Sequence, residues 1–315
     1  MSGEEDGRER RIVTAALFLV AAVGLGLGLG AAFSPEGSTR ALAVPALGLQ
    51  TLLTVGALPR RERSVDLRPG LVLLGLHHAL ASLPLALVGL AIGLDEPLGF
   101  GLFLIAAAPP AALIPAYADV AEVPGGDLLV FVLLGYGVAL GLTPALVYLA
   151  AGEIVGVGPI ALTLGAGLVA PALLGRLLHP QIVRIPQRVR RGVVNTSIVV
   201  ICFGLGGGLP DGLGSSEFSV ATFGVVLAAL AARSVGGAAL AARLAPADLR
   251  IEAPFAVAFK NVALAAAVGG SLLGAVAALP GLLGFPVEVL YFLFLARQRA
   301  RRTDSGIAPR VPIAP

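Results

Sequence analysis

Charged residues, cysteine, tryptophan and lysine are all scarce in this sequence, and each scarcity excludes a class of protein or site. Only 13% of the 315 residues are charged, whereas 57% are hydrophobic. Soluble globular proteins carry about 25% charged residues, so a soluble domain is excluded. The single cysteine, Cys202, has no partner for an internal disulfide and cannot form a metal site alone. Tryptophan is absent, so orientation in a membrane must depend on arginine.

Catalytic motifs are missing as well. The sequence contains no H-E-x-x-H, no G-x-S-x-G and no Walker loop. Its glycine clusters at 24–30 and 206–208 lie inside apolar runs, where glycine favours close helix packing rather than phosphate binding. The net charge of +3 reflects arginines in loops, which we expect to face lipid phosphates. We therefore predict no enzyme, no catalytic residue, no metal or other cofactor, and no nucleic-acid partner.

Long apolar runs dominate what remains. A transmembrane helix needs about 20 apolar residues, and about ten runs approach that length. The boundary between the last two runs is the least defined. The runs cover residues 12–33, 41–58, 70–94, 100–118, 128–151, 154–178, 192–209, 218–240, 251–270 and 271–296. This pattern predicts an all-α polytopic membrane protein in contact with the lipid bilayer.

Arginines gather in alternate breaks between these runs. The second break holds Arg60, Arg61, Arg63 and Arg68, and the sixth and eighth breaks are also basic. The breaks between them carry acids such as Asp95 and Glu96, with Arg40 as the basic exception. By the positive-inside rule both termini are cytoplasmic, in a multi-pass protein of the cell membrane.

The span count suggests a duplication. Five spans, a basic cytoplasmic segment and five more spans place the two halves in opposite orientations, as in the inverted repeats of secondary transporters. We expect a cytoplasmic tail at 1–10, a first five-helix repeat at 11–152, a second at 153–297 and a cytoplasmic tail at 298–315. Pro109, Pro110 and Pro115 in the fourth span, and Pro254 in the ninth, predict interrupted helices, because proline removes an amide donor. A simple kink against a neighbouring helix is the alternative for the fourth span.

The only lysine in the chain lies near the middle of the ninth run, which reads IEAPFAVAFKNVALAAAVGG. An ammonium at that depth costs about 2.5–3.5 kcal/mol, so Lys260 is the leading site residue. The alternative is a lysine whose stem reaches an interface, but about nine helical residues on either side oppose this.

Five further residues are weaker candidates. Asn261 either orients a bound anion or caps an opened helix, and Arg233 carries a deep charge that either serves a site or reaches the cytoplasmic side. His77 and His78 point about 100° apart on a helix and cannot share one ion, so one lines a cavity or both are packing residues. Asp119 is either a counter-ion or a helix cap.

Several stretches resemble the bile acid:sodium symporter family. LQTLLTVGALPRRERSVDLRPGLVLLGLHHALASLPLALVG is similar to its second and third spans. Residues 108–115 fall where the family carries C-P-G-G-x-x-S-N, followed by a Gly-Asp pair that is Gly126-Asp127 here. AARLAPADLRIEAPFAVAFKNVALA resembles the family's E-x-G-x-Q-N-x-x-L-A crossing helix and its preceding loop. The resemblance implies ten helices in two inverted five-helix repeats, divided into a panel and a core, with discontinuous helices 4 and 9 crossing in the core. It also implies organic anions such as bile acids or small carboxylates as substrates.

The departures from that pattern concern the sodium ligands. Ala256 stands where the family has its sodium-binding glutamate, and Lys260 replaces its glutamine, whereas Asn261 is kept. Ile114-Pro115 replaces the Ser-Asn pair. Ala108 replaces the cysteine that the arsenite-efflux branch uses, which argues against arsenite.

We therefore expect a sodium-independent secondary transporter of small organic anions. In the family one carboxylate with two sodium ions leaves a local charge of about +1, and a protonated Lys260 without that carboxylate leaves the same charge. Proton cycling on Lys260 would supply coupling, and a permanently charged lysine would give uniport. The alternatives are a non-transporting sensor or scaffold and a sodium-coupled symporter. A cavity beside Lys260 and Asn261 would favour transport, and a sealed pair would favour the sensor. The oligomeric state is left open.

Overall fold

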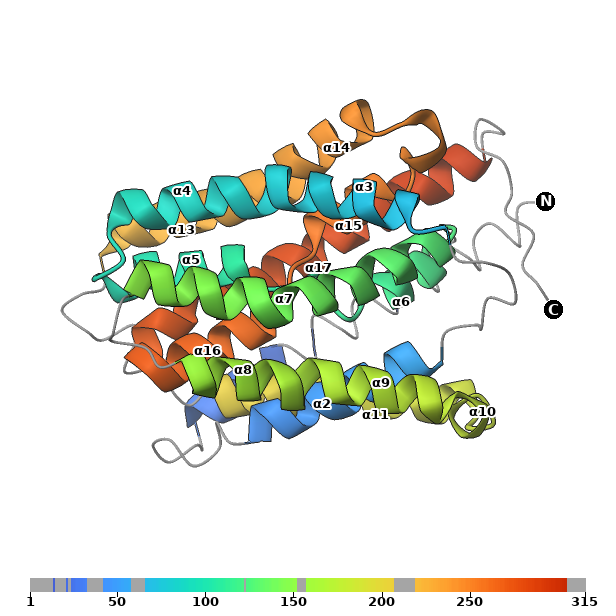
Figure 1. The fold of residues 1–315 in the computed structure, drawn as a ribbon, viewed down its shortest axis with the longest axis horizontal. Coiled ribbons are helices and arrows are strands. Elements are labelled where there is room, and N and C mark those ends of the chain that lie inside the picture. The colour runs from blue at the N-terminus through green and yellow to red at the C-terminus, as the bar shows by residue number, and fades with distance from the viewer. Residues whose placement is uncertain are drawn as a thin grey trace.

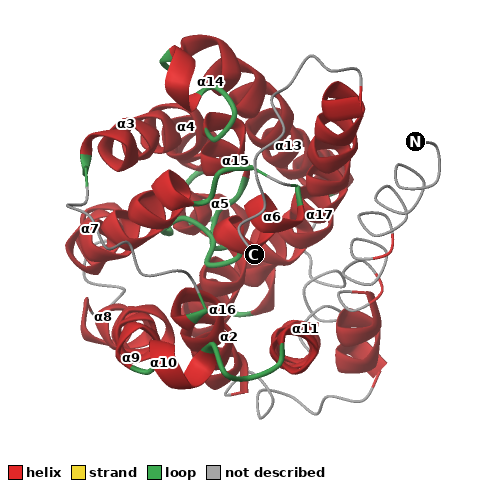
Figure 2. Cartoon of the chain, turned by 90° about the vertical axis from the view of Figure 1, so that its right-hand side faces the viewer, coloured by secondary structure: helices red, strands yellow, loops and turns green. Residues whose placement is uncertain are grey.

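The computed structural model describes residues 14, 21, 24–32, 42–57, 66–121, 123–151, 157–206 and 219–304. Within this part of the chain the regular structure is helical, apart from one isolated β-bridge between Pro110 and Lys260 (Figure 2). Four of these helices are long and apolar enough to cross a membrane: Arg68–Ile92, Gly126–Leu149, Val220–Leu244 and Ala275–Arg299. The prediction of an all-α membrane protein is thus confirmed at this level.

Three of the other apolar runs form shorter helices than the sequence predicts. The run at 41–58 yields α2 (Ala43–Gly56), and the runs at 100–118 and 251–270 are each divided by a break. Mean hydropathy over a long window does not register these breaks, because each is only a few residues long and the helices on both sides are apolar.

One layer of the molecule contains α2, α8 (Val157–Leu164), α9 (Ala170–Leu177), α10 (His179–Ile182) and α11 (Gln187–Gly206) (Figure 1). The π-helical segment η4 (Gly165–Val169) joins α8 to α9. Glycines bring α2 against α9: a Cβ added to Gly175 would lie 2.5 Å from the carbonyl oxygen of Leu52. We call these helices the lower layer, after their place in Figure 1.

The same order of elements occurs twice in the rest of the described chain. The first set is α3 (Arg68–His77), π-helical η2 (His78–Ser82) and α4 (Leu83–Ile92), then α5 (Pro97–Ala107) and α6 (Ile114–Val120), then α7 (Gly126–Ala151). The second set is α13 (Val220–Ala231), π-helical η5 (Ala232–Gly237) and α14 (Ala238–Leu244), then α15 (Ala253–Ala258) and α16 (Val262–Leu273), then α17 (Ala275–Asp304). The short η6 (Ala247–Leu249) links α14 to α15. Each set therefore contains a helix with a π segment, an interrupted helix and a long helix.

Both spans predicted to be interrupted are interrupted, but only the first break lies at the predicted prolines. It falls between α5 and α6, at Pro109 and Pro110. The second falls between α15 and α16, at Lys260, whereas Pro254 lies in the first turn of α15, where proline is tolerated. Gly274, with φ 82°, separates α16 from α17 and defines the boundary that hydropathy left open.

Arginine-bearing helix ends share one end of the molecule. The start of α3 at Arg68, the last turn of α14 with Arg243 and the last turns of α17 with Arg297 lie at the right in Figure 1, and α10 lies there too. The end of α4 and the start of α5, beside Asp95 and Glu96, lie at the opposite end.

Candidate functional site

The two helix breaks meet and satisfy each other's backbone. The main-chain nitrogen of Asn261 donates to the carbonyl oxygen of Pro109 at 2.9 Å, and the nitrogen of Ala111 donates to the carbonyl of Phe259 at 3.4 Å. These bonds surround the bridge between Pro110 and Lys260. Backbone N–H and C=O groups that a helix break exposes inside a membrane protein need hydrogen-bond partners. At this junction each break supplies partners to the other.

Lys260 lies at the centre of this junction and is 1% exposed. Its Nζ donates to Ser82 Oγ at 2.6 Å and to the carbonyl oxygen of Ala106 at 2.8 Å. In a continuous helix the Ala106 carbonyl would accept from the nitrogen four residues on, but that residue is Pro110, which has no N–H. The proline thus frees the oxygen that receives the ammonium. The alternative in which the lysine reaches an interface is wrong.

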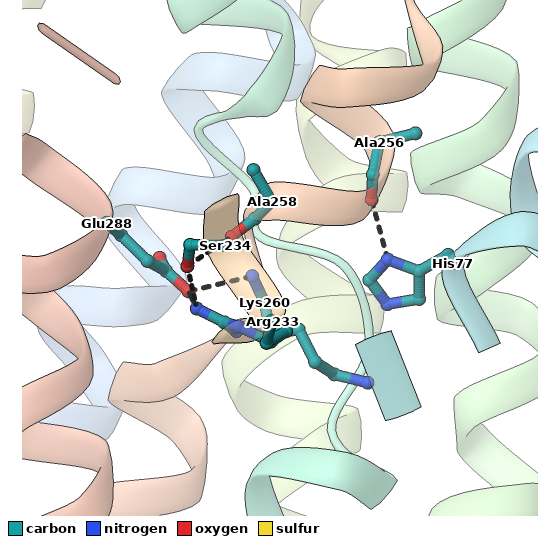
Figure 3. Close-up of polar contacts among 7 residues, drawn as sticks. All are labelled: His77, Arg233, Ser234, Ala256, Ala258, Lys260 and Glu288. Carbon is teal, nitrogen blue, oxygen red and sulfur yellow. Dashed lines mark hydrogen bonds and ion pairs between the residues drawn. The ribbon is translucent and has the colours of Figure 1, made fainter. Parts of the chain in front are cut away.

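Arg233 forms a buried ion pair that the sequence did not reveal. The guanidinium, in η5, donates from Nη2 to Glu288 Oε1 at 2.7 Å, and Arg233 is 2% exposed. The interpretation that it reaches the cytoplasmic side is therefore wrong. The same Nη2 lies 3.1 Å from Ser234 Oγ (Figure 3), while Nε and Nη1 have no hydrogen-bond partner among the described residues.

Glu288, like Ser82, is a residue of this site that sequence reasoning missed. Its Oε1 also accepts from the main-chain nitrogen of Lys260 at 3.0 Å, so one carboxylate oxygen joins α17, η5 and the second break. The signal was present, because Glu288 is the only charged residue in the run at 271–296. A carboxylate inside a membrane span costs free energy, as the ammonium of Lys260 does, so it marks a candidate site residue.

The neighbouring histidines have separate partners. His77 is fully buried and its Nδ1 lies 2.6 Å from the carbonyl oxygen of Ala256, which fixes α3 against α15. His78 is half-buried, and its Nδ1 lies 3.1 Å from Ser82 Oγ, the oxygen that also binds Lys260. His78 is thus connected to the lysine, whereas His77 is bound to the main chain.

Asn261 caps the second half of the interrupted helix. Its Oδ1 accepts from the main-chain nitrogen of Leu264 at 3.0 Å, the usual N-cap bond. Its φ of −77° and ψ of 70°, with the bond from Val262 N to the Lys260 carbonyl at 2.8 Å, form an inverse γ-turn. The amide Nδ2 is buried and has no hydrogen-bond partner in the described part of the chain. Asn261 is therefore a helix cap whose Nδ2 remains an unpaired donor.

The remaining predicted residues have different places. Pro109 and Pro110 form the junction itself, whereas Pro115 is buried in the first turn of α6, away from the bridge to Lys260. Asp119 belongs to α6, but its side chain lies outside the described part of the structure. The site therefore brings together Lys260, Asn261, Pro109, Pro110, Arg233, Glu288, Ser82 and His78.

The site has a surplus of positive charge and almost no free space. Its ionisable core is one ammonium, one guanidinium and one carboxylate, a formal surplus of one positive charge. A cavity of about 10 Å³, enough for one water, lies beside it. Helices α5, α7, α8 and α16 line the cavity through Leu104, Ala108, Thr143, Leu164, Leu264, Ala265 and Val268. A larger hollow of about 300 Å³, lined by Glu96, Thr222 and four apolar residues, lies at the ends of α4 and α13, at a distance from the crossing.

Comparisons of the chain with protein-family models and with curated protein sequences found no match.

Proposed function

We propose that this protein is a secondary transporter of small organic anions that works without sodium. The observation that carries the proposal is the position of Lys260 Nζ on the oxygens of Ser82 and Ala106, where two interrupted helices cross. Converging oxygens at a break in membrane helices are the surroundings that transporters give to a coupling cation. Here a covalently attached cation fills that place.

The resemblance to the bile acid:sodium symporter family supports the same assignment. The repeated order of elements from α3 to α7 and from α13 to α17 agrees with two inverted repeats, and the lower layer agrees with a panel packed on a core. On this proposal the lower layer contributes the first two spans of each repeat. The arginine-bearing helix ends then face the cytoplasm, and both termini lie on that side.

The charges of the site agree with replacement of bound metal. The family pattern holds one carboxylate and two sodium ions, and this site holds one carboxylate, Glu288, and two fixed cations, Lys260 and Arg233. The surplus of one positive charge attracts one anion.

A non-transporting sensor or scaffold is the second candidate, and the sealing of the site favours it. Lys260 is 1% and Asn261 4% exposed, and the cavity beside them has room for only one water. In a transporter this sealed site would be an occluded state, which opens when the lower layer separates from the rest of the molecule. A sodium-coupled symporter is a further candidate, but two fixed cations occupy the site where sodium would bind.

Uptake by proteoliposomes tests these candidates. The experiment measures entry of radiolabelled monocarboxylates, from acetate to cholate, in sodium-free buffer with and without a pH gradient. Transport predicts saturable uptake that Lys260→Met abolishes. Faster uptake under the pH gradient indicates proton coupling, and equal uptake indicates uniport. Uptake that requires sodium contradicts the proposal. Absence of uptake, together with carboxylate-dependent thermal stabilisation of the wild type, would favour the sensor.

A further inference from the structure

A hydrogen-bonded chain connects the buried amine to the molecular surface. Lys260 Nζ donates to Ser82 Oγ at 2.6 Å, and Ser82 Oγ lies 3.1 Å from His78 Nδ1. Along this chain exposure increases from the fully buried lysine to the half-buried histidine. Three groups that can each give or accept a proton thus form one continuous path.

The helix geometry explains how this path arises. His78 and Ser82 are the first and last residues of η2, a π-helical segment between α3 and α4. A π segment has i→i+5 hydrogen bonds, and such segments occur frequently at functional sites. The four-residue spacing places both side chains on the same side of the segment, so the serine hydroxyl lies between the imidazole and the ammonium.

We propose that His78 and Ser82 are the route by which the proton of Lys260 leaves and returns. This inference rests on the proposed function, because it supplies proton coupling to that transporter. In the outward step a Nζ–H bond of Lys260 breaks as an O–H bond forms on Ser82. The Ser82 hydroxyl hydrogen passes to His78 Nδ1, which was neutral. The imidazolium then releases its Nε2 proton to water that enters when the occluded site opens to one side of the membrane, because His78 itself lies near the middle of the span Arg68–Ile92. The net change is one proton transferred from the ammonium to solvent, with Ser82 restored as a hydroxyl.

The second half of the chain offers a matched comparison. Ser234 lies in η5, the π segment of the second set of elements, and is fully buried. It accepts from Arg233 Nη2 and, at 3.4 Å, donates to the carbonyl oxygen of Ala258, but it makes no bond to Lys260. Because arginine does not deprotonate in proteins, Ser234 has no proton to carry. Comparing variants of Ser82 and Ser234 therefore distinguishes a role in proton transfer from a role in packing.

Other charged groups near the path bear on its pH dependence. Those in the described elements packed around it are His77 on α3, Arg233 on η5 and Glu288 on α17. His77 Nδ1 is hydrogen-bonded to the carbonyl oxygen of Ala256 and not to Ser82. Glu288 touches Lys260 only at the main-chain nitrogen. The direct proton partners of the ammonium are thus Ser82 and, through it, His78.

The experiment uses the fact that Lys260 is the only lysine in the chain. The full-length protein, purified with a lysine-free tag and placed in lipid nanodiscs, is labelled with ¹³C,¹⁵N-lysine and gives one Cε–Nζ signal. NMR follows this signal from about pH 5 to about pH 10 and measures the proton exchange rate of Nζ. The variants are S82A and H78Q, with S82T as the hydroxyl-retaining rescue and S234A and H179Q as controls. His179 is a suitable control because it bonds Gly56 in the lower layer.

We expect S82A and H78Q to slow proton exchange at Nζ by about a hundredfold, since positioned proton-transfer groups contribute factors of that order. S82T, S234A and H179Q should keep the wild-type rate. The route is overturned if S82A and H78Q, still folded, exchange as fast as the wild type, or if Lys260 keeps one charge state over the whole range. Neither result excludes uniport, so the transport proposal is tested separately by uptake. Conversely, slowed exchange in S82A supports the route even if no carboxylate is transported.

Discussion

Glu288 Oε1 lies 3.0 Å from the main-chain nitrogen of Lys260, so this carboxylate binds the lysine through its backbone and not through its ammonium (Figure 3). The Lys260 side chain extends away from Glu288 to Ser82 and Ala106. The carboxylate is neutralised instead by Arg233. Glu288 therefore fixes the position of the break, while the ammonium remains without a carboxylate and supplies the surplus charge of the site.

Replacing either Arg233 or Glu288 alone should strongly destabilise the protein, whereas replacing both together should cost much less stability. Removing one partner of a buried ion pair costs about 3–5 kcal/mol, because the other charge is left unpaired. We expect R233M and E288L each to lower the thermal midpoint strongly, and the double variant to recover most of the loss. Cys202 reports unfolding, because this only thiol is fully buried and reacts with a fluorogenic maleimide when the protein opens. Additive losses in the double variant would show that the pair is not coupled.

Lys260 should be a residue whose removal stabilises the protein and abolishes its function. Lys260→Met leaves Ser82 and Ala106 without a donor, a cost of about 1–3 kcal/mol. It also removes a buried ammonium that has no carboxylate beside it, and desolvating such an ion costs several kcal/mol. We expect a thermal midpoint equal to or above that of the wild type, with sodium-free uptake lost. A merely structural lysine would give the opposite result, a lower midpoint with uptake retained.

The first interruption and the central lysine are predictable from the sequence because each follows from the chemistry of one kind of residue. Pro109 and Pro110 lack the amide hydrogens that a helix needs, and Lys260 is the only lysine in a chain otherwise supplied with arginine. Such features appear at a single position, so no knowledge of the fold is required. The resemblance placed both breaks at a crossing, and the main-chain bonds between Asn261 and Pro109 agree with that placement.

The partners of these residues are not predictable in the same way, because they are distant along the chain. Arg233 and Glu288 are separated by 55 residues, and Ser82 and Lys260 by 178. The π segments η2 and η5 carry no pattern of proline or glycine common to both, so Ser82 and Ser234 gave no sequence signal. The prediction of ten spans is not confirmed, and for a related reason: helix length depends on where backbone bonds end, and hydropathy does not record this.

Two variants of Asn261 should distinguish the effect of helix capping on stability from the effect of site charge on uptake. Asn261→Ala removes the bond to Leu264 N, and loss of an N-cap costs about 0.5–2 kcal/mol, so the thermal midpoint should fall. Asn261→Asp keeps the capping oxygen and the stability but places a carboxylate next to Lys260. It should therefore reduce carboxylate uptake, because the added charge neutralises the surplus. If uptake by the aspartate variant equals that of the wild type, the positive surplus does not attract the substrate.

Gly135 should control the position of the first break, and Gly137 on the same helix provides the matched control. A Cβ on Gly135 would lie 2.6 Å from Cδ and Cγ of Pro110, a rigid ring attached to the junction backbone. Gly135→Ala should therefore displace Pro110 from Lys260, and overpacking of this kind costs about 1–3 kcal/mol. A Cβ on Gly137 meets nothing within 4 Å, so Gly137→Ala should be neutral or stabilising by about 1 kcal/mol through helix propensity. Thermal unfolding read through Cys202 and sodium-free uptake measure both effects. Equal midpoints and equal uptake in the two variants would show that α7 does not hold the proline in place.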